Sequence, residues 1–310
     1  MSQSRIDKID IKNFLSISDL KTDDLLRVFE LSAKFKRNDI NVDFGNKILG
    51  LIFDKASTRT RISFQVAISN LGGNTIELNP QTSQIGRGEP IKDTARVLSR
   101  YCDVVAIRTF QQIDIEEYAK WSDIPVINAL TDLEHPCQVL ADFFTIKEEF
   151  KNFDNTVITF IGDGNNVANS LILCACILGV EIRIACPEGF EPKKSIIKKA
   201  LKLNPSNKIK VTNNIAEALN GANVIYTDVW ASMGEEGKKE FKEKKFKGFS
   251  INSKNLKLAS EKSIVLHCLP AYRGKEITDE IIDCPQSRIF NQAENRLHTQ
   301  QALLALILNQ

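Results

Sequence analysis

The sequence has no long hydrophobic run, few residues that break regular structure, and no excess of one charge. The longest apolar stretch, residues 171–180, is well short of the ~18 residues that suggest a membrane-spanning helix. Residues 1–10 are polar and lack the apolar core of a signal peptide, so we expect no secretion signal. With 9 prolines and 15 glycines in 310 residues, the composition also excludes a collagenous or low-complexity chain.

The charge balance and the cysteine content limit which partners the protein can bind and in which compartment it works. The 41 Lys and Arg residues exceed the 39 Asp and Glu residues by a formal charge of +2. This excess provides no general field for binding nucleic acid or an anionic membrane. The 7 cysteines are an odd number and lack the spacing of a disulfide framework or a zinc site. We therefore expect a cytoplasmic protein with reduced thiols.

Apolar segments alternate with amphipathic segments along the whole chain, which predicts an α/β fold. The length exceeds what one hydrophobic core usually serves. We predict two domains, 1–150 and 151–292, each a parallel sheet flanked by helices, with a C-terminal helix (293–310) that packs back on the first domain. The predicted strands are 47–53, 104–109, 125–128, 157–162, 180–186, 208–212, 224–228 and 264–267. The predicted helices are 22–36, capped by Thr22, and 135–150, 167–178, 192–203 and 293–308.

The segment after the first strand is rich in hydrogen-bond donors. In sheets of this kind, ligands bind beyond the carboxyl ends of the strands. Ser57 or Thr58 would cap the following helix, which places free backbone N–H groups beside the hydroxyl of Thr60 and the guanidinium of Arg59. Several neutral donors and one planar cation suit a phosphate group. The alternative is an ordinary capped helix with exposed arginines.

Two further candidates follow later strands of the first domain. Arg108 closes an apolar strand and would reach the edge of the sheet. His135 and Gln138 open a helix with Pro136 at a favoured first-turn position, and their spacing of three puts both on one side of that turn. Taken singly, Arg108 could be a salt-bridged surface residue and His135 a capping residue.

The second domain begins with a turn that only partly matches a dinucleotide-binding fingerprint. Gly162 and Gly164 follow a strand, but Val167 replaces the third glycine. A nicotinamide-dependent dehydrogenase is thus a weak alternative. Asn165 and Asn166 instead offer neutral donors and acceptors that suit a zwitterionic small molecule.

Acidic and thiol side chains follow two other strands of this domain. Asp228 could hold an ammonium group, or it could be a turn residue that binds its own backbone. Cys268, beside His267, could meet an amine or act in proton transfer, whereas Cys174 and Cys176 lie in an apolar run typical of a core.

The charged segment 238–247 is typical of a solvated helix or loop, and its functional alternative is a cover over the site. Arg296 lies at the start of the predicted final helix.

Taken together, four motifs carry a resemblance to a known family. Ser57-Thr-Arg-Thr-Arg61, His135-Pro-Cys-Gln138, Asp228 with Ser232-Met-Gly234, and His267-Cys-Leu-Pro270 occur in this order. The chain closely resembles the ornithine carbamoyltransferases, within the aspartate/ornithine carbamoyltransferase family, from about Asn13 to the final helix. The resemblance implies transfer of the carbamoyl group of carbamoyl phosphate to the δ-amine of L-ornithine, giving citrulline and phosphate.

The resemblance also implies the roles of individual residues. Carbamoyl phosphate would be bound by Ser57, Thr58, Arg59, Thr60, Gln84, Arg108, His135, Gln138, Cys268, Leu269 and Arg296. Ornithine would be bound by Asn166, Asp228, Ser232 and Met233, and the catalytic residues would be Arg108, His135 and Cys268. It further implies a carbamoyl-phosphate domain followed by an ornithine domain, no cofactor or metal, and a homotrimer in which Gln84 reaches a neighbouring subunit's site.

Other interpretations differ in class or in substrate. A non-catalytic small-molecule sensor on the same scaffold need not keep Arg59, His135, Asp228 and Cys268 together. Aspartate-specific relatives carry a lysine-bearing loop at 84–89 and lack the cysteine at 268. Putrescine and N-acylated ornithine are harder to exclude as acceptors. The compact length and the lack of an evident extra assembly segment favour arginine synthesis over arginine breakdown, and a simple trimer.

Overall fold

The structure, a computed structural model, describes residues 9–79, 83–231 and 236–309. The chain divides into two compact units. Unit 1 comprises residues 1–144 and 294–310, and unit 2 comprises residues 145–293. The divisions fall within two helices, α5 (Pro136–Phe150) and α12 (Ile289–Leu308).

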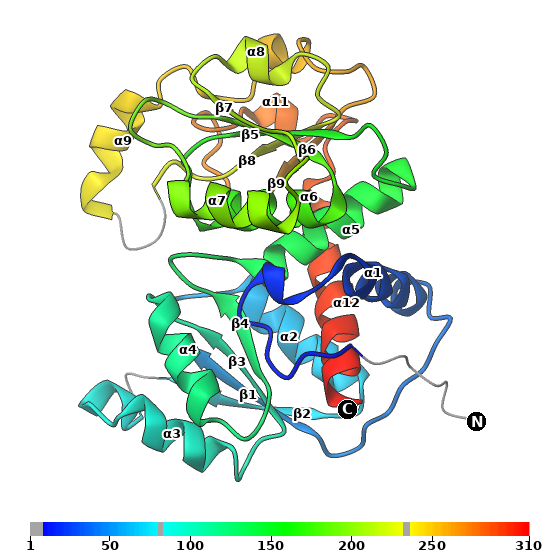
Figure 1. Cartoon of the computed structure of the whole chain (residues 1–310), viewed down its shortest axis with the longest axis vertical. Helices are drawn as coiled ribbons and strands as arrows, with labels where there is room; N and C mark the ends of the chain where they lie inside the picture. The colour runs from blue at the N-terminus through cyan, green and yellow to red at the C-terminus, as the bar shows by residue number, and fades with distance from the viewer. Residues whose placement is uncertain (1–8, 80–82, 232–235, 310) are drawn as a thin grey trace. The chain divides into compact units, whose positions relative to one another are not determined.

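Unit 1 contains a parallel sheet with the strand order β2-β1-β3-β4. Its strands are β1 (Ile48–Phe53), β2 (Asn74–Leu78), β3 (Val104–Arg108) and β4 (Val126–Leu130). Helices lie on both faces of the sheet (Figure 1). They are α1 (Thr22–Lys36), α2 (Arg59–Asn70), α3 (Ile91–Leu98), α4 (Gln112–Trp121) and the parts of α5 and α12 that belong to this unit, with the 3-10 turns η1 (Ile17–Asp19) and η3 (Ile85–Arg87).

Unit 2 contains a five-stranded parallel sheet with the order β7-β6-β5-β8-β9. Its strands are β5 (Val157–Ile161), β6 (Glu181–Ala185), β7 (Ile209–Thr212), β8 (Val224–Thr227) and β9 (Ile264–His267). Helices again lie on both faces, with α6 and α7 on one and α8 and α11 on the other (Figure 1). The helices are α6 (Asn166–Leu178), α7 (Lys194–Leu203), α8 (Ile215–Leu219), α9 (Lys239–Lys245), α10 (Ser253–Leu256) and α11 (Asp279–Ile282), with the 3-10 turn η4 (Glu236–Lys238).

These two sheets confirm the predicted fold class, including the return of the C-terminal helix to the first unit. The central strands were predictable because they are buried on both faces, as β3 is along its whole length. β2 was missed. It is an edge strand with mostly exposed side chains, so it has no continuous apolar run to mark it.

One predicted helix cap is wrong, and the final helix starts earlier than predicted. Thr22 is the first helical residue rather than the cap, and the N-cap is Lys21, whose backbone N–H donates to Asp24 Oδ2 (3.1 Å). α12 begins at Ile289, four residues before the predicted start at Ala293, because Ile289 belongs to the apolar core of unit 2.

Each sheet has a point where the strand order reverses. In unit 1 the chain leaves β1 for β2 on one side and later places β3 on the other, so the reversal lies between β1 and β3. In unit 2 it lies between β5 and β8. A crevice forms beyond the carboxyl ends of the strands at such a point, which is where α/β sheets bind ligands. The donor-rich segment follows β1, and Asp228 follows β8.

No helix within the described ranges is long and apolar enough to cross a lipid bilayer.

Candidate functional site

A buried network joins three of the predicted phosphate-site residues in unit 1. The guanidinium of Arg296, on α12, donates through Nη2 to Thr60 Oγ1 (2.6 Å) and through Nη1 to Gln138 Oε1 (2.8 Å). Gln138 Nε2 in turn donates to Asp142 Oδ1 (2.8 Å). All four side chains are buried, so the cation is fixed by its neighbours rather than by solvent. Arg296 is therefore well inside α12, not at its start as predicted.

His135 lies in the electrostatic field of three arginines. Its side chain is buried directly before α5. Burial holds its pKa well below the ordinary value, and the positive charges of Arg296, Arg108 and Arg59 lower it further. The structure thus brings His135 together with these predicted partners. A neutral imidazole at physiological pH can donate a hydrogen bond to a ligand without adding a fourth positive charge.

The helix start after β1 differs in detail from the prediction. Thr58 occupies the N-cap position of α2, but its side chain makes no capping hydrogen bond and its backbone is helical. Thr58 is exposed, while Ser57 and Arg59 are partly exposed. The predicted side-chain cap is therefore wrong. This difference favours a ligand site. Because the hydroxyl of Thr58 accepts no hydrogen bond from the first turn of α2, the N–H groups of that turn remain available to an anion.

Arg108 and Gln84, two further residues of the predicted phosphate site, differ in burial. Arg108 is the last residue of β3 and is buried, so the alternative of a salt-bridged surface residue is wrong. Gln84 is the exposed N-cap of η3. Within the described residues, its side chain makes no hydrogen bond to another member of the predicted phosphate site. Its place in that site stays a prediction.

In unit 2, Asp228 accepts three hydrogen bonds although it is buried. Cys268 Sγ and the backbone N–H of Val229 donate to Oδ1 (2.9 and 2.7 Å), and Asn165 Nδ2 donates to Oδ2 (2.8 Å). The contact with the N–H of Val229 is the one expected if Asp228 were only a turn residue that binds its own backbone. The contacts from Asn165 and Cys268 go beyond it, because they join Asp228 to two other strand ends.

The turn after β5 explains why the dinucleotide fingerprint is misleading. A Cβ atom on Gly164 would lie 2.3 Å from the backbone nitrogen of Pro192, so this glycine is required by chain packing. Asn165 caps α6 by accepting from the N–H groups of Val167 and Ala168 (3.0 and 3.1 Å). An amide therefore occupies the donors that a pyrophosphate would need. Asn166 is the first residue of α6 and is half-buried.

Sequence reasoning missed the support behind Cys268. His267 Nδ1 accepts the backbone N–H of Leu269 (2.8 Å), and its Nε2 lies 3.2 Å from Glu276 Oε1. The first contact assigns the ring proton to Nε2, which then donates to the carboxylate. Leu269 has a φ of +56°, a left-handed conformation that costs energy for a branched side chain. Since Glu276 is nine residues away and belongs to no recognisable motif, no sequence signal marked it.

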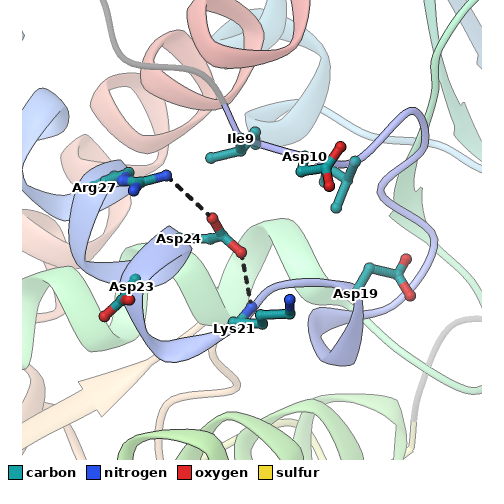
Figure 2. A pocket seen from close by; sticks show the side chains of 8 residues that line it. Ile9, Asp10, Asp19, Lys21, Asp23, Asp24 and Arg27 are labelled. Atoms are coloured by element: carbon teal, nitrogen blue, oxygen red, sulfur yellow. Dashed lines mark hydrogen bonds and ion pairs between the residues drawn. The ribbon is translucent and has the colours of Figure 1, made fainter.

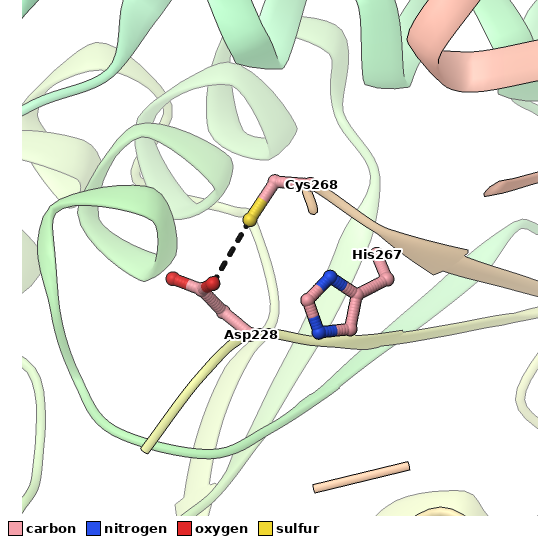
Figure 3. Close-up of side chains that lie close together, drawn as sticks. All are labelled: Asp228, His267 and Cys268. Atoms are coloured by element: carbon pink, nitrogen blue, oxygen red, sulfur yellow. Dashed lines mark hydrogen bonds between the residues drawn. The ribbon is translucent and has the colours of Figure 1, made fainter. Parts of the chain in front are cut away.

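Asp228, His267 and Cys268 offer ligand atoms within 4.8 Å of one another, which raises the question of a metal ion (Figure 3). Figure 3 shows the thiol directed at the carboxylate. Both imidazole nitrogens are engaged, by Leu269 and Glu276, so an ion would have to break one of these buried contacts. The cluster therefore fits a hydrogen-bonded unit better than a metal centre.

A pocket of about 530 Å³ lies elsewhere in unit 1, over η1 and the start of α1 (Figure 2). Asp19, Asp24 and Arg27 are among its lining residues. Asp19 and Asp24 already accept local backbone N–H groups, and Arg27 pairs with Asp24 (3.7 Å). The lining shares no residue with the predicted site, so we assign no function to this pocket.

Profiles of one family match both parts of the chain. The carbamoyl-P binding domain of aspartate/ornithine carbamoyltransferases matches residues 12–148, and their Asp/Orn binding domain matches residues 154–307. The chain belongs to the aspartate/ornithine carbamoyltransferase family. The resemblance seen in the four motifs is thereby confirmed.

Relatives within this family align over nearly the full length. An ornithine carbamoyltransferase of Prochlorococcus marinus (strain MIT 9312) is 65% identical over 303 residues, covering 97% of this chain and 98% of the relative. The solved ornithine carbamoyltransferase of Pyrococcus furiosus is 42% identical with a TM-score of 0.92, covering 96% and 97% of the two chains. The anabolic enzyme of Campylobacter jejuni is 41% identical with a TM-score of 0.91, covering 96% and 99%.

Ser232 and Met233 lie outside the described residues, so their predicted role in binding ornithine stays a prediction. The 7 cysteines all occur as free thiols in the structure.

Proposed function

We propose that the chain transfers the carbamoyl group of carbamoyl phosphate to the δ-amine of L-ornithine, releasing citrulline and phosphate. The observation that carries this proposal is the chemistry at the two reversal points. One presents arginines and hydroxyls that suit a dianion, and the other presents a carboxylate and a thiol that suit an amine. The high identity to ornithine carbamoyltransferases over nearly the full chain supports the same reaction.

The roles of the two parts follow from this chemistry. Residues 1–150 form the proposed carbamoyl-phosphate-binding domain, residues 151–292 the ornithine-binding domain, and residues 293–310 the helix that supplies Arg296 to the first. The family profiles, which end at 148 and begin at 154, support the placement of the first boundary.

The phosphate group is proposed to bind at the start of α2. Arg59 and the hydroxyls of Ser57 and Thr60 would stabilise the charge that grows on the departing phosphate. Charge-assisted hydrogen bonds contribute ~1.5–3 kcal/mol each, so a single guanidinium can dominate binding.

The carbonyl end is proposed to face Thr58, Arg108 and His135, with Gln138 and Arg296 completing the site. Negative charge develops on the carbonyl oxygen when the amine attacks. Donors that are fixed before the reaction stabilise this charge without reorganising, which is worth several kcal/mol. The low pKa of His135 makes its imidazole a neutral donor in this position.

The acceptor must lose a proton before it can attack. An alkyl amine has a pKa of about 10.4, so its neutral form near pH 7.5 costs about 4 kcal/mol. A carboxylate against that amine would increase the cost by favouring the charged form. We therefore propose that Asp228 and Cys268 engage the α-ammonium of ornithine, with Asn166, Ser232 and Met233. The δ-amine is then left in uncharged surroundings.

Additional roles complete the proposal. The backbone at Cys268 and Leu269 would bind carbamoyl phosphate, which gives Cys268 its catalytic role.

We also propose a cytoplasmic homotrimer, with Gln84 reaching a neighbouring subunit, that works in arginine biosynthesis without a cofactor. The relative from Campylobacter jejuni that is described as anabolic supports the biosynthetic direction.

The experiment that tests the reaction is a product assay with carbamoyl phosphate and four acceptors in parallel: ornithine, putrescine, N-acetylornithine and aspartate. Only ornithine should give a carbamoylated product at a high rate. Preference for another acceptor would refute the proposed substrate, and binding of a nicotinamide cofactor would revive the dehydrogenase alternative.

A further inference from the structure

A buried ion pair connects α9 to the turn after β5 in unit 2. Lys242 Nζ donates to Asp163 Oδ2 (2.6 Å), and the two side chains are only 5% and 15% exposed. The charged segment around Lys242 was predicted to be solvated, and this residue contradicts that expectation. Burying a charged lysine costs free energy unless the charge is paired, so Lys242 depends on Asp163 for its buried position.

Aromatic contacts bind the same elements together. The ammonium of Lys242 lies 5.8 Å from the ring centre of Phe190, and the Phe190 ring packs edge-on against Phe246 (4.8 Å) at the end of α9. Phe246 also stacks on Trp230 (5.9 Å), which follows Asp228 by two residues. α9 is therefore attached both to the turn after β5 and to the chain that leaves β8.

The turn carrying Asp163 leads directly to the proposed ornithine contacts. The backbone oxygen of Asp163 accepts the N–H of Asn165 (2.7 Å), and Asn165 Nδ2 donates to Asp228 (2.8 Å). On its other side the turn is held by Gly164, whose N–H donates to Phe190 O (2.8 Å). A shift of Asp163 would consequently move the amide that orients the Asp228 carboxylate.

We propose that Lys242 is a positioning residue for the amino-acid acceptor. Its ammonium neutralises Asp163 and fixes the turn that carries Asn165 and Asn166, so that Asp228 is the carboxylate presented to the α-ammonium of ornithine. This inference rests on the proposed assignment of unit 2 to ornithine. It adds a residue that contacts neither substrate but sets the affinity for one of them.

The test is a steady-state comparison of four variants. Lys242→Met keeps a long unbranched side chain and removes the charge, Lys242→Arg keeps the charge, and Asp163→Asn removes the charge of the partner. Lys244→Met, at an exposed lysine of the same helix, is the matched control. We expect Lys242→Met and Asp163→Asn to raise KM for ornithine about tenfold or more, because one of two buried partners loses its charge. kcat and KM for carbamoyl phosphate should change less than about threefold. Lys242→Arg should restore most of the affinity, and the control should match the wild type.

Several results would overturn the inference. An unchanged KM for ornithine in Lys242→Met, even with a lower melting temperature, would show a purely structural ion pair. Failure of Lys242→Arg to improve on Lys242→Met would show that charge is not the requirement. If Lys242→Met does not fold, Asp163→Asn decides in the same way. A rise in KM for carbamoyl phosphate instead of ornithine would contradict the assignment of unit 2 itself, which distinguishes failure of the proposed function from failure of this inference.

Discussion

The two units carry candidate side chains of opposite charge at corresponding strand ends of their sheets. Each places candidate side chains at the carboxyl ends of parallel strands around the point where the strand order reverses, at β1, β3 and β4 in unit 1 and at β5, β8 and β9 in unit 2. In unit 1 these positions carry arginines around a neutral histidine. In unit 2 they carry a carboxylate that accepts from a thiol and an amide. The fold therefore provides the place, and the side chains determine which reactant is bound.

The comparison predicts that charge changes in each unit affect one substrate only. The largest effect is expected for Asp228→Asn. Loss of a buried charge that pairs with a ligand cation costs about 2–5 kcal/mol, so kcat/KM for ornithine should fall by roughly a thousandfold. KM for carbamoyl phosphate should stay within about twofold of the wild type. A comparable loss for both substrates would contradict the division of labour between the units.

Arg59→Ala is the reciprocal change in unit 1. Removing one guanidinium from a phosphate group should weaken carbamoyl-phosphate binding about a hundredfold, or roughly 3 kcal/mol. Initial rates over a range of carbamoyl-phosphate concentrations measure this effect, with Arg87→Ala, at an exposed arginine in η3, as the control. Near-normal saturation by carbamoyl phosphate would remove Arg59 from the proposed site.

Cys268→Ser sharpens the assignment within unit 2. A serine hydroxyl can still donate to Asp228, but it is shorter than the thiol and places its proton differently. We expect kcat/KM for ornithine to fall by about tenfold, less than for Asp228→Asn, because the carboxylate stays in place. A loss as large as that of Asp228→Asn would indicate that the thiol itself takes part in the chemistry.

The smallest effect concerns stability rather than rate. Since the pKa of His135 is well below its ordinary value in the folded protein, the unfolded chain binds a proton as the pH falls below about 6.5 while the folded chain does not. Stability is therefore lost on acidification, by about 1 kcal/mol for this residue between pH 7.5 and 5.5. Urea unfolding of the wild type and His135→Gln at these two pH values measures the difference. Equal pH dependence in both proteins would show that His135 is not held neutral.

The elements that could be predicted from the sequence have one physical property in common, a local contrast between apolar and polar residues. Strands such as β3 and β9 are buried throughout, so their apolar runs stand out from the flanking helices. Candidate residues at the strand ends, including Arg108 and Asp228, were found because a polar side chain after a buried strand is conspicuous. The missed features depend on tertiary contacts. β2 is an exposed edge, and Lys242 looks like its solvated neighbours until Asp163 is placed beside it.

Long-range hydrogen bonds were likewise invisible. Arg296 reaches Thr60 across 236 positions, and Glu276 supports His267 from nine residues away with no motif to mark it. Motif reasoning found Arg296 through family resemblance alone. Local pattern could not have shown that its guanidinium is shared between α2 and α5.

The central claim is that the charge of carbamoyl phosphate is bound by the arginines of unit 1 and that the carboxylate of Asp228 in unit 2 serves only the acceptor. Equilibrium binding of carbamoyl phosphate to the wild type, Arg59→Ala and Asp228→Asn, in the absence of ornithine, tests it most directly. We predict wild-type affinity in Asp228→Asn and a loss of about a hundredfold in Arg59→Ala. Equal weakening in both variants, or full affinity in Arg59→Ala, would contradict the account.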